Sequence, residues 1–277
     1  MSLSLLLEFW PLALALLATG LFAGLIAGLL GIGGGIVLVP VLEYTLSLLD
    51  FPSAWRMHVA VATSLATIIP TAIASSRAHH ARGGIDWALA RAWAPGMLLG
   101  GLLGSLVAAR VDAALLSAVF GIISLFAAIK LALPLDHIRL RDEPPRGLGG
   151  VSIAAGIGSV SAMMGIGGGT LSVPAITITG GPVHRAVGTA AFFGLLLALP
   201  GTVGYLLASP TEALPGMTVG LVSFGALLLV APASTLMAPV GARLAHHLAQ
   251  RRLSQIFALF LLIVATRMFY NIMPFGL

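Results

Sequence analysis

Long apolar segments recur from one end of the chain to the other, and they constrain its fold more than any other feature. Each is near the ~20 residues that an α-helix needs to cross ~30 Å of hydrocarbon. Hydrophobic residues make up 58% of the 277-residue chain, whereas charged residues make up 8%. The sequence therefore predicts an all-α polytopic membrane protein. About eight long spans are expected, at residues 10–30, 57–76, 92–109, 112–133, 148–165, 185–207, 215–240 and 253–273.

Two shorter apolar pieces, 36–49 and 170–180, each follow a glycine cluster. They are expected to be half-helices, re-entrant segments or thin tilted spans, which allows up to ten crossings in all. The longest polar stretch, 134–147, is rich in proline and charge and is typical of a linker. We therefore expect an N-terminal transmembrane repeat at 1–133, a linker at 134–147 and a C-terminal transmembrane repeat at 148–277.

The two halves are expected to be homologous because they share three blocks of sequence in the same order. "GIGGG" is followed in both halves by a proline five residues after the last glycine. "HVAVAT" in the first half matches "HRAVGT" in the second, and a proline followed by a glycine comes later in each. The matched positions are Gly31–Gly35 with Gly165–Gly169, Pro40 with Pro174, 58–63 with 184–189, Pro95 with Pro232, and Gly104 with Gly241.

The basic residues predict how the halves are oriented, because Lys and Arg concentrate on the cytoplasmic side. A cytoplasmic loop at 77–91 puts all but Arg56, Arg110 and Arg267 of the 14 basic residues inside. Both termini then lie outside and the linker lies in the cytoplasm, and each glycine cluster enters and leaves the membrane on one face. The halves therefore begin on opposite faces, as in the inverted repeats of secondary transporters.

The glycine clusters predict a binding site. A non-helical break in hydrocarbon is tolerated only where protein or a water-filled cavity surrounds it. The helix that follows presents free N–H groups and the positive end of its dipole, which suits an anion, and glycine allows close approach. The candidate substrate-binding residues are Gly33, Gly34, Gly35, Gly167, Gly168, Gly169 and Thr170, and the second cluster also carries Ser172 where the first has Leu38.

The alternative is that these glycines only permit tight helix crossings, as glycines spaced by four residues do. Replacing Gly34 or Gly168 by alanine is therefore expected to impair transport more than the same change at Gly24 or Gly100. Spaced glycines of this second kind are assigned to helix packing or to a homodimer; they are Gly20, Gly24, Gly28, Gly96, Gly100 and Gly104.

Other polar residues in the spans are candidates with two interpretations. His58 and His184 are either cationic gates of an anion path or ordinary interfacial histidines. Thr63 and Thr189, five residues further on, are either deeper hydrogen-bond donors or bond back to their own helix. Glu43 is the one candidate for a coupling carboxylate, and an interfacial carboxylate is the alternative.

Several function classes are disfavoured by the sequence. It contains no G-x-x-x-x-G-K-[ST] motif, so it does not hydrolyse ATP by that route. An intramembrane serine protease would need a histidine at the depth of its serine, but the histidines lie at span ends or in loops. No cofactor or metal is expected, because cysteine is absent and the paired histidines lack carboxylate partners. The net charge of +5 falls in the gaps between spans, so it indicates topology and no nucleic-acid partner.

The paired "GIGGG…P" blocks resemble those of the TauE/SafE family of sulfite and organosulfur anion exporters. The resemblance covers nearly the whole chain and implies a transporter in the bacterial inner (plasma) membrane for sulfite, an organosulfonate or thiosulfate. A cell interior negative by about 100 mV expels each anionic charge with roughly 2.3 kcal/mol, so export needs no coupling ion. The alternatives are a passive anion channel and a proton-coupled uptake permease. The expected partners are a small anionic substrate and the lipid bilayer.

Overall fold

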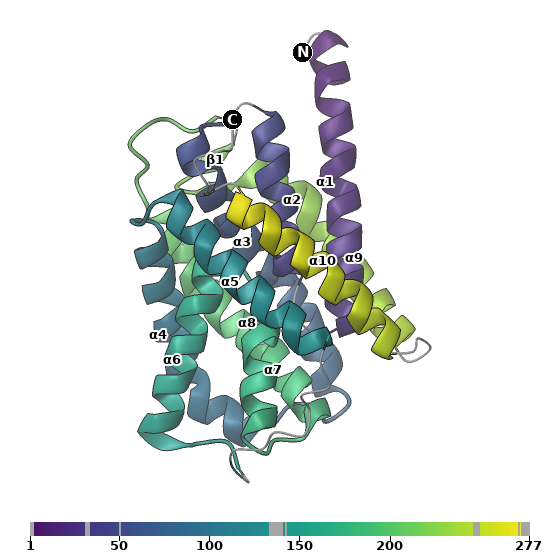
Figure 1. The fold of residues 1–277 in the computed structure, drawn as a ribbon, viewed down its shortest axis with the longest axis vertical. Coiled ribbons are helices and arrows are strands. Elements are labelled where there is room, and N and C mark those ends of the chain that lie inside the picture. Colours follow the sequence, from purple (N-terminus) through teal and green to yellow (C-terminus); the bar gives the residue numbers. More distant parts are fainter. Residues whose placement is uncertain are drawn as a thin grey trace.

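The computed structural model describes residues 3–30, 34–49, 51–132, 141, 143–215, 217–245, 250–270 and 272. The described part of the chain is a bundle of ten helices with one short β-hairpin (Figure 1). The elements are α1 (Leu3–Leu30), α2 (Gly35–Leu48), α3 (Ser53–His80), α4 (Trp87–Ala108), α5 (Ala113–Ala132), α6 (Gly147–Met164), α7 (Gly169–Ile178), α8 (Val183–Leu206), β1 (Thr218–Val219), β2 (Val222–Ser223), α9 (Phe224–Ala245) and α10 (Gln250–Tyr270).

Many of these helices have the length or composition of membrane segments. Within the described residues, five helical segments are long and apolar enough to cross a membrane, and four shorter apolar segments accompany them. The prediction of a helical polytopic membrane protein is thereby confirmed. The five long segments are Ser53–His80, Ala113–Ala132, Gly147–Met164, Val183–Leu206 and Phe224–Gly241, and the shorter ones are Ala13–Ile26, Gly35–Leu48, Gly169–Ile178 and Phe257–Tyr270.

The helices of one half pack mainly against helices of the other. Helix α1 packs along α9, and its counterpart in the second half, α6, packs along α4. In the same way α4 contacts α8 while α9 contacts α3, and the pairs α3–α8 and α5–α10 each join two counterparts. Figure 1 shows α5 and α10 side by side across the front of the bundle. Each half therefore buries its apolar faces by means of the other half.

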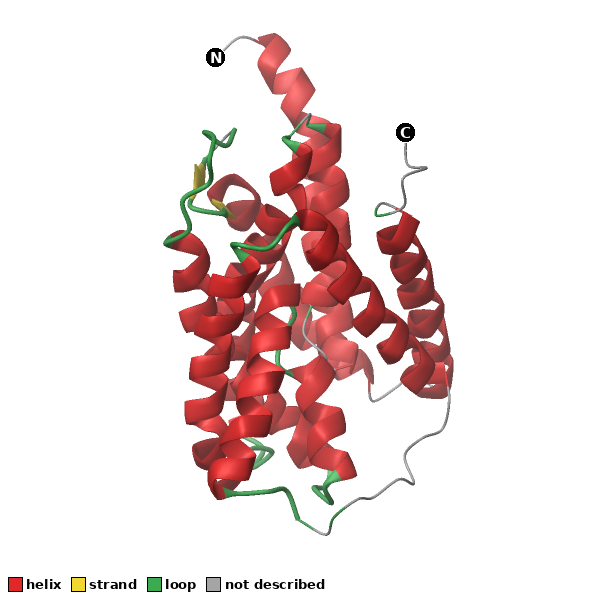
Figure 2. Ribbon diagram, turned by 60° about the vertical axis from the view of Figure 1, so that its left-hand side comes forward, coloured by secondary structure: helices red, strands yellow, loops and turns green. Residues whose placement is uncertain are grey.

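The bundle has two ends, which we name by what lies there. At the hairpin end, the start of α3 contacts the turn between α4 and α5, and β1 and β2 lie nearby (Figures 1 and 2). At the linker end, the loop between α3 and α4 contacts the start of α8, and the start of α6 contacts α4. Helices α1 and α2 have their outer ends at the hairpin end, whereas α6 and α7 have theirs at the linker end (Figure 1). Each short helix thus returns toward the end of the bundle from which the preceding long helix came.

Close contacts between backbones hold together the helix pairs α1–α9 and α4–α6, each of which joins the two halves. A Cβ placed on Gly24 would overlap the backbone of Ser234 in α9, and one on Gly100 would overlap the carbonyl oxygen of Ala155 in α6. Gly20 meets Val230 in α9 in the same manner. The prediction that spaced glycines serve helix packing is confirmed at these positions. Their partners are helices of the same chain, so they are not free for a dimer contact.

One predicted span begins too early. The sequence indicates a span at 215–240, but the structure has the β-hairpin first and begins α9 at Phe224. Gly220 forms the turn with a φ of 57°, a backbone conformation that glycine adopts readily. Leu221 and Val222 are fully buried against the bundle. Apolar residues buried in protein cannot be told from apolar residues facing lipid by sequence alone, so the predicted span includes them.

Candidate functional site

The two glycine clusters meet inside the bundle. A Cβ placed on Gly35, the first residue of α2, would overlap the carbonyl oxygen of Gly165 and lie 2.8 Å from the Cα of Ile166. Only two bare stretches of backbone can approach so closely, which is why glycine is needed here. The start of α2 therefore lies directly on the end of α6.

The second break is built by local backbone hydrogen bonds. Gly165 ends α6 with a φ of 63°, and its N–H donates to the carbonyl of Ala162 at 3.2 Å. The N–H of Ile166 donates to the carbonyl of Ser161 at 3.0 Å, which satisfies another carbonyl at this helix end. Gly168 is then the N-cap of α7. All residues from Gly165 to Thr170, Gly167 and Gly169 included, are buried.

Helices α3 and α8 enclose this second break from two sides. Ser64, in the middle of α3, donates a hydrogen bond from its Oγ to the carbonyl of Gly165 at 2.7 Å. On the other side, a Cβ on Gly168 would lie 2.8 Å from both the carbonyl oxygen of Ala190 and the nitrogen of Gly194, in α8. The break is therefore held between the two long central helices.

The first break is described from Gly34 onward, and Gly33 lies outside the described residues. Gly34 is the N-cap of α2, and its carbonyl accepts from the N–H groups of Val37 at 3.1 Å and Leu38 at 2.9 Å. A Cβ on Gly34 would lie 3.0 Å from the carbonyl oxygen of Ala23 in α1. The chain thus folds back on α1 before the short helix begins.

The arrangement places the start of α2 on the end of α6 and the start of α7 against α8, both in the protein interior. An α-helix leaves its first N–H groups without acceptors inside the helix and carries partial positive charge there. The atoms nearest to Gly34, Gly35 and Gly168 belong to the backbone or to small apolar side chains, and a serine hydroxyl bonds to the Gly165 carbonyl. Such a site can attract an anion through backbone dipoles alone.

Three serines lie near the second break, and Ser172 is the one that the sequence already indicates as a hydroxyl donor. Ser64, Ser161 and Ser172 are fully buried, and the Oγ atoms of Ser161 and Ser172 have no hydrogen-bond partner. A buried hydroxyl without a partner is costly, and a ligand with acceptor oxygens would satisfy it. The sequence signal for Ser172 is the comparison of the two halves, because the first cluster has Leu38 at the matched position.

The matched threonines bond to loops of the opposite half. The Oγ1 of Thr63 accepts from the N–H of Ser223 at 2.9 Å, and the Oγ1 of Thr189 accepts from the N–H of Asp86 at 2.9 Å. Neither sequence interpretation includes this contact, in which the threonine oxygen accepts a hydrogen bond from the opposite half. Thr67 shows the local pattern instead, because its hydroxyl donates to the Thr63 carbonyl at 2.9 Å.

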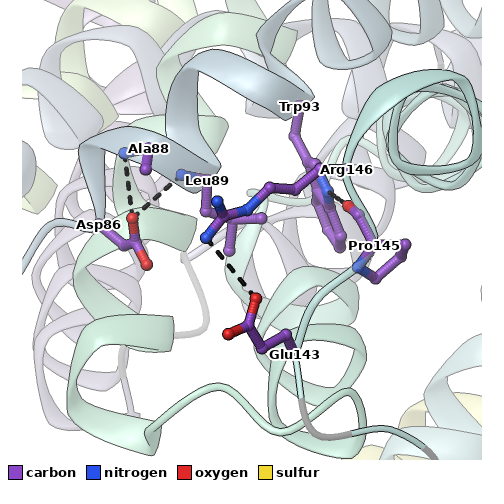
Figure 3. A network of polar contacts seen from close by, with 7 residues as sticks. All are labelled: Asp86, Ala88, Leu89, Trp93, Glu143, Pro145 and Arg146. Atoms are coloured by element: carbon purple, nitrogen blue, oxygen red, sulfur yellow. Dashed lines mark hydrogen bonds and ion pairs between the residues drawn. The ribbon is translucent and has the colours of Figure 1, made fainter.

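Asp86 has a second role at the linker end of the bundle. Its carboxylate caps α4, with Oδ1 accepting from the N–H groups of Ala88 and Leu89 at 3.0 Å each (Figure 3). Close by, the indole Nε1 of Trp93 donates to the carbonyl of Pro145 at 2.9 Å, which fixes the start of α6 against α4 (Figure 3). The end of the loop before α4 is therefore fixed through both the backbone and the side chain of Asp86.

The matched histidines have different surroundings. His58 is buried, donates from Nε2 to the carbonyl of Val111 at 2.8 Å and packs its ring against Trp55. His184 is exposed in the first turn of α8. His58 thus ties α3 to the turn between α4 and α5.

Glu43 is paired with a cation on another helix. Its Oε2 lies 3.6 Å from Nη2 of Arg267 in α10, and the same guanidinium lies over the ring of Tyr44, 4.5 Å from its centroid. These contacts join α2 to α10 between the break and the hairpin end. Within the described residues, no group of three or more carboxylates and histidines is placed to hold a metal ion.

A helical bundle with several membrane-length apolar helices and two interrupted ones defines the class of multi-pass membrane proteins. The chain belongs to the TauE/SafE family, described as "Sulfite exporter TauE/SafE", which matches residues 16–268. The family resemblance seen in the sequence is thus confirmed.

Similar proteins occur in bacteria and archaea. A probable membrane transporter protein of Haemophilus influenzae is 34% identical over 254 residues, which cover 91% of this chain and 96% of the relative. One of Methanocaldococcus jannaschii is 30% identical over 229 residues, covering 81% and 83%. The probable membrane transporter protein YunE of Bacillus subtilis is 25% identical over 275 residues, covering 92% and 97%. No solved structure matches the chain. The family and these names indicate a membrane transporter and not an enzyme.

Proposed function

We propose that this protein is a secondary transporter that exports small sulfur-containing anions through a site between its two helix breaks. The observation that carries the proposal is the contact of Gly35 with Gly165, which places the start of α2 on the end of α6, four residues before α7 begins. The family description, sulfite exporter, supports the choice of anion. The binding groups are the backbone N–H groups near Gly34, Gly35, Gly168, Gly169 and Thr170.

The chemistry of the site suits an oxyanion. Two helix starts supply partial positive charge through backbone groups, and an anion held by partial charges can leave as readily as it enters. Ser161 and Ser172 add hydroxyl donors on the side of the second break only. Sulfite, thiosulfate and an organosulfonate head group all present several acceptor oxygens to such donors.

We also propose that the halves are inverted repeats in the plasma membrane. The exchange of packing partners between counterpart helices and the opposite ends from which α1 and α6 enter both support this arrangement. By the positive-inside rule the linker end lies in the cytoplasm and the hairpin end lies outside. The basic residues at the linker end include Arg77, Arg82, Arg91, Arg146 and Arg185, and those at the hairpin end include Arg56, Arg110 and Arg267.

Export without a coupling ion is the direction that the charges favour. Glu43 is paired with Arg267, whose guanidinium also lies over the Tyr44 ring, and this supports a structural role over that of a proton carrier. A membrane potential of about 100 mV, negative inside, then drives a singly charged anion outward with roughly 2.3 kcal/mol, a gradient of about 50-fold.

Flux measurements on the purified full chain in proteoliposomes test the proposal. Sulfite, thiosulfate and sulfoacetate are each loaded, a potassium potential is imposed with valinomycin, and release is compared with that from protein-free vesicles. Saturable release that reverses with the sign of the potential and shows counterflow is expected. Equal flux at both potentials would contradict electrogenic export, non-saturating flux would indicate a channel, and no flux of any of the three would refute the substrate class.

A further inference from the structure

Two loops close the ends of the central helix pair in the same way. Residues 81–86 lead into α4 at the linker end, and residues 217–223 lead into α9 at the hairpin end. The last residue of each loop, Asp86 or Ser223, donates its backbone N–H to a threonine hydroxyl 2.9 Å away. Because Thr189 and Thr63 belong to the opposite halves, each of these bonds joins the two halves.

The two contacts are counterparts made from different side chains. Asp86 and Ser223 each directly precede a helix, and each side chain accepts from an N–H of that helix, at 3.5 Å for Ser223 with Ala226. Thr63 is 1% exposed and Thr189 is 0% exposed, so both hydrogen bonds are shielded from solvent. A pairing that recurs at both ends with unlike loop sequences indicates a shared purpose.

Each of the two threonines directly precedes a residue that contacts the second break. Thr63 precedes Ser64, which bonds to the carbonyl of Gly165. Thr189 precedes Ala190, whose carbonyl meets Gly168. The threonines are therefore placed between the breaks and the two ends of the bundle, one toward each end.

The loops fill the space at these positions. The carbonyl of Gly84 packs where a Cβ of Gly188 would lie, immediately before Thr189. In the hairpin, Gly220 packs against the end of α8, and Leu221 and Val222 are fully buried. The part of each loop next to its helix therefore enters the bundle, at 84–86 and at 220–223, whereas 81–83, Met217 and Val219 are exposed.

We propose that these two loops are the gates of the transport path and that each is held shut by one threonine clasp. The hairpin gate, 217–223, is closed by Thr63, and the linker gate, 81–86, is closed by Thr189. This inference rests on the proposed function, since it names how access to the site between the breaks is controlled. Both clasps are made in this structure. Opening of one gate breaks its own clasp and leaves the clasp at the other end intact.

Cysteine labelling in the membrane tests the gates, because the chain contains no cysteine and every introduced thiol reports alone. The reporter is Ser172→Cys, which replaces a fully buried hydroxyl beside the second break. Thr63→Val and Thr189→Val remove the clasp hydroxyls and nearly keep the side-chain shape. Thr67→Val on α3 and Thr202→Val on α8 are matched controls, since both threonines are buried and neither makes a hydrogen bond to the opposite half.

Loss of one buried hydrogen bond to a backbone N–H is expected to raise the population of the open gate about tenfold. With a membrane-impermeant methanethiosulfonate reagent, Thr63→Val should therefore raise the labelling rate about tenfold from the hairpin end only. Thr189→Val should do so from the linker end only, and the controls should label at the rate of the reporter alone. Right-side-out and inside-out vesicles give the two directions of access.

Three outcomes would refute the proposal that the loops are gates, provided that the variants stay monodisperse. The labelling rate could rise from both ends, rise from the opposite end, or not rise at all. If the Ser172→Cys chain does not fold, Ser161→Cys replaces it as reporter, because Ser161 is equally buried at the same break. The labelling requires no substrate. End-specific labelling without sulfur-anion flux would therefore refute the proposed substrate and keep the gates, whereas flux without end-specific labelling would refute the gates alone.

Discussion

Replacing Gly168 by alanine is the sharpest test of the site between the breaks. A Cβ at this position would lie 2.8 Å from the carbonyl oxygen of Ala190 and 2.8 Å from the nitrogen of Gly194. Both atoms belong to the backbone of α8, so no side chain can rotate away to make room. The start of α7 must instead move away from α8.

The size of the effect follows from this contact. Reaching an ordinary contact of 3.4 Å requires a displacement of roughly half an ångström, and overpacking of this kind costs about 1–3 kcal/mol. The displacement moves the N–H groups at the start of α7 relative to α2. We expect the half-saturation concentration for sulfite efflux to rise about tenfold, which corresponds to ~1.4 kcal/mol of lost binding.

The control is chosen by the structure. Gly156, in the middle of α6, has no atom within 4 Å of a Cβ placed on it, so Gly156→Ala adds a methyl group in open space. Alanine is also favoured over glycine inside a helix by about 1 kcal/mol. Gly24 and Gly100, which the sequence suggests as controls, are unsuitable because a Cβ at either would overlap a neighbouring backbone.

The assay is efflux from proteoliposomes, normalised to the folded fraction from size-exclusion chromatography. Gly168→Ala is expected to show weaker saturation by sulfite, and Gly156→Ala is expected to behave as the unaltered chain does. An unchanged half-saturation concentration in Gly168→Ala would refute the binding role of the break. An equal loss in Gly156→Ala would show that the assay reports general damage.

Two further variants test single contacts around the site. Ser64→Ala leaves the buried carbonyl of Gly165 without its side-chain donor, so we expect stability to fall by about 1–3 kcal/mol in thermal unfolding, whereas Ser124→Ala, which removes a buried hydroxyl without a partner, should change little. Glu43→Gln keeps the size of the side chain and removes the charge paired with Arg267, so potential-driven efflux should persist with the same dependence on an imposed pH gradient. Loss of that pH dependence in Glu43→Gln would instead make Glu43 a coupling residue.

The local structure of the breaks was predictable, because it depends on neighbouring residues. A run of three glycines disfavours a helix, and Gly34 and Gly168, each within such a run, are the N-caps of the two short helices. The packing of Gly24 and Gly100 was predictable for a similar reason, since spacing by four residues places small residues on one helix face. Both features can be recognised from a few adjacent positions.

The contacts between the halves were not predictable, because their partners are far apart in the sequence and unlike in chemistry. Thr63 and Thr189 match in the alignment of the halves, but their partners are an aspartate and a serine that bond through backbone N–H groups. Comparison of the two halves therefore identifies the threonines but does not predict their hydrogen-bond partners. The sequence predicts the hairpin that carries Ser223 as part of a span because residues such as Leu221 are apolar. Leu221 is buried by protein, however, and not by lipid.

The two kinds of contact between the halves differ in strength, and this difference links the gates to the breaks. Backbone contacts at Gly24 and Gly100 clamp α1 to α9 and α4 to α6, and such close packing resists sliding. The clasps, in contrast, are single hydrogen bonds worth about 1 kcal/mol each. Both clamped pairs also contact the central helices, and in the second pair a Cβ on Gly101 in α4 would overlap the backbone of Leu197 in α8, while one on Gly165 at the end of α6 would lie 2.5 Å from the carbonyl oxygen of Val61 in α3. One pair combines α1, which precedes the first break, with α9, which follows the hairpin gate, and the other combines α6 and the second break with α4 and the linker gate. We therefore expect a movement that opens a gate to displace one of the two helix breaks as well, so that access and affinity change together.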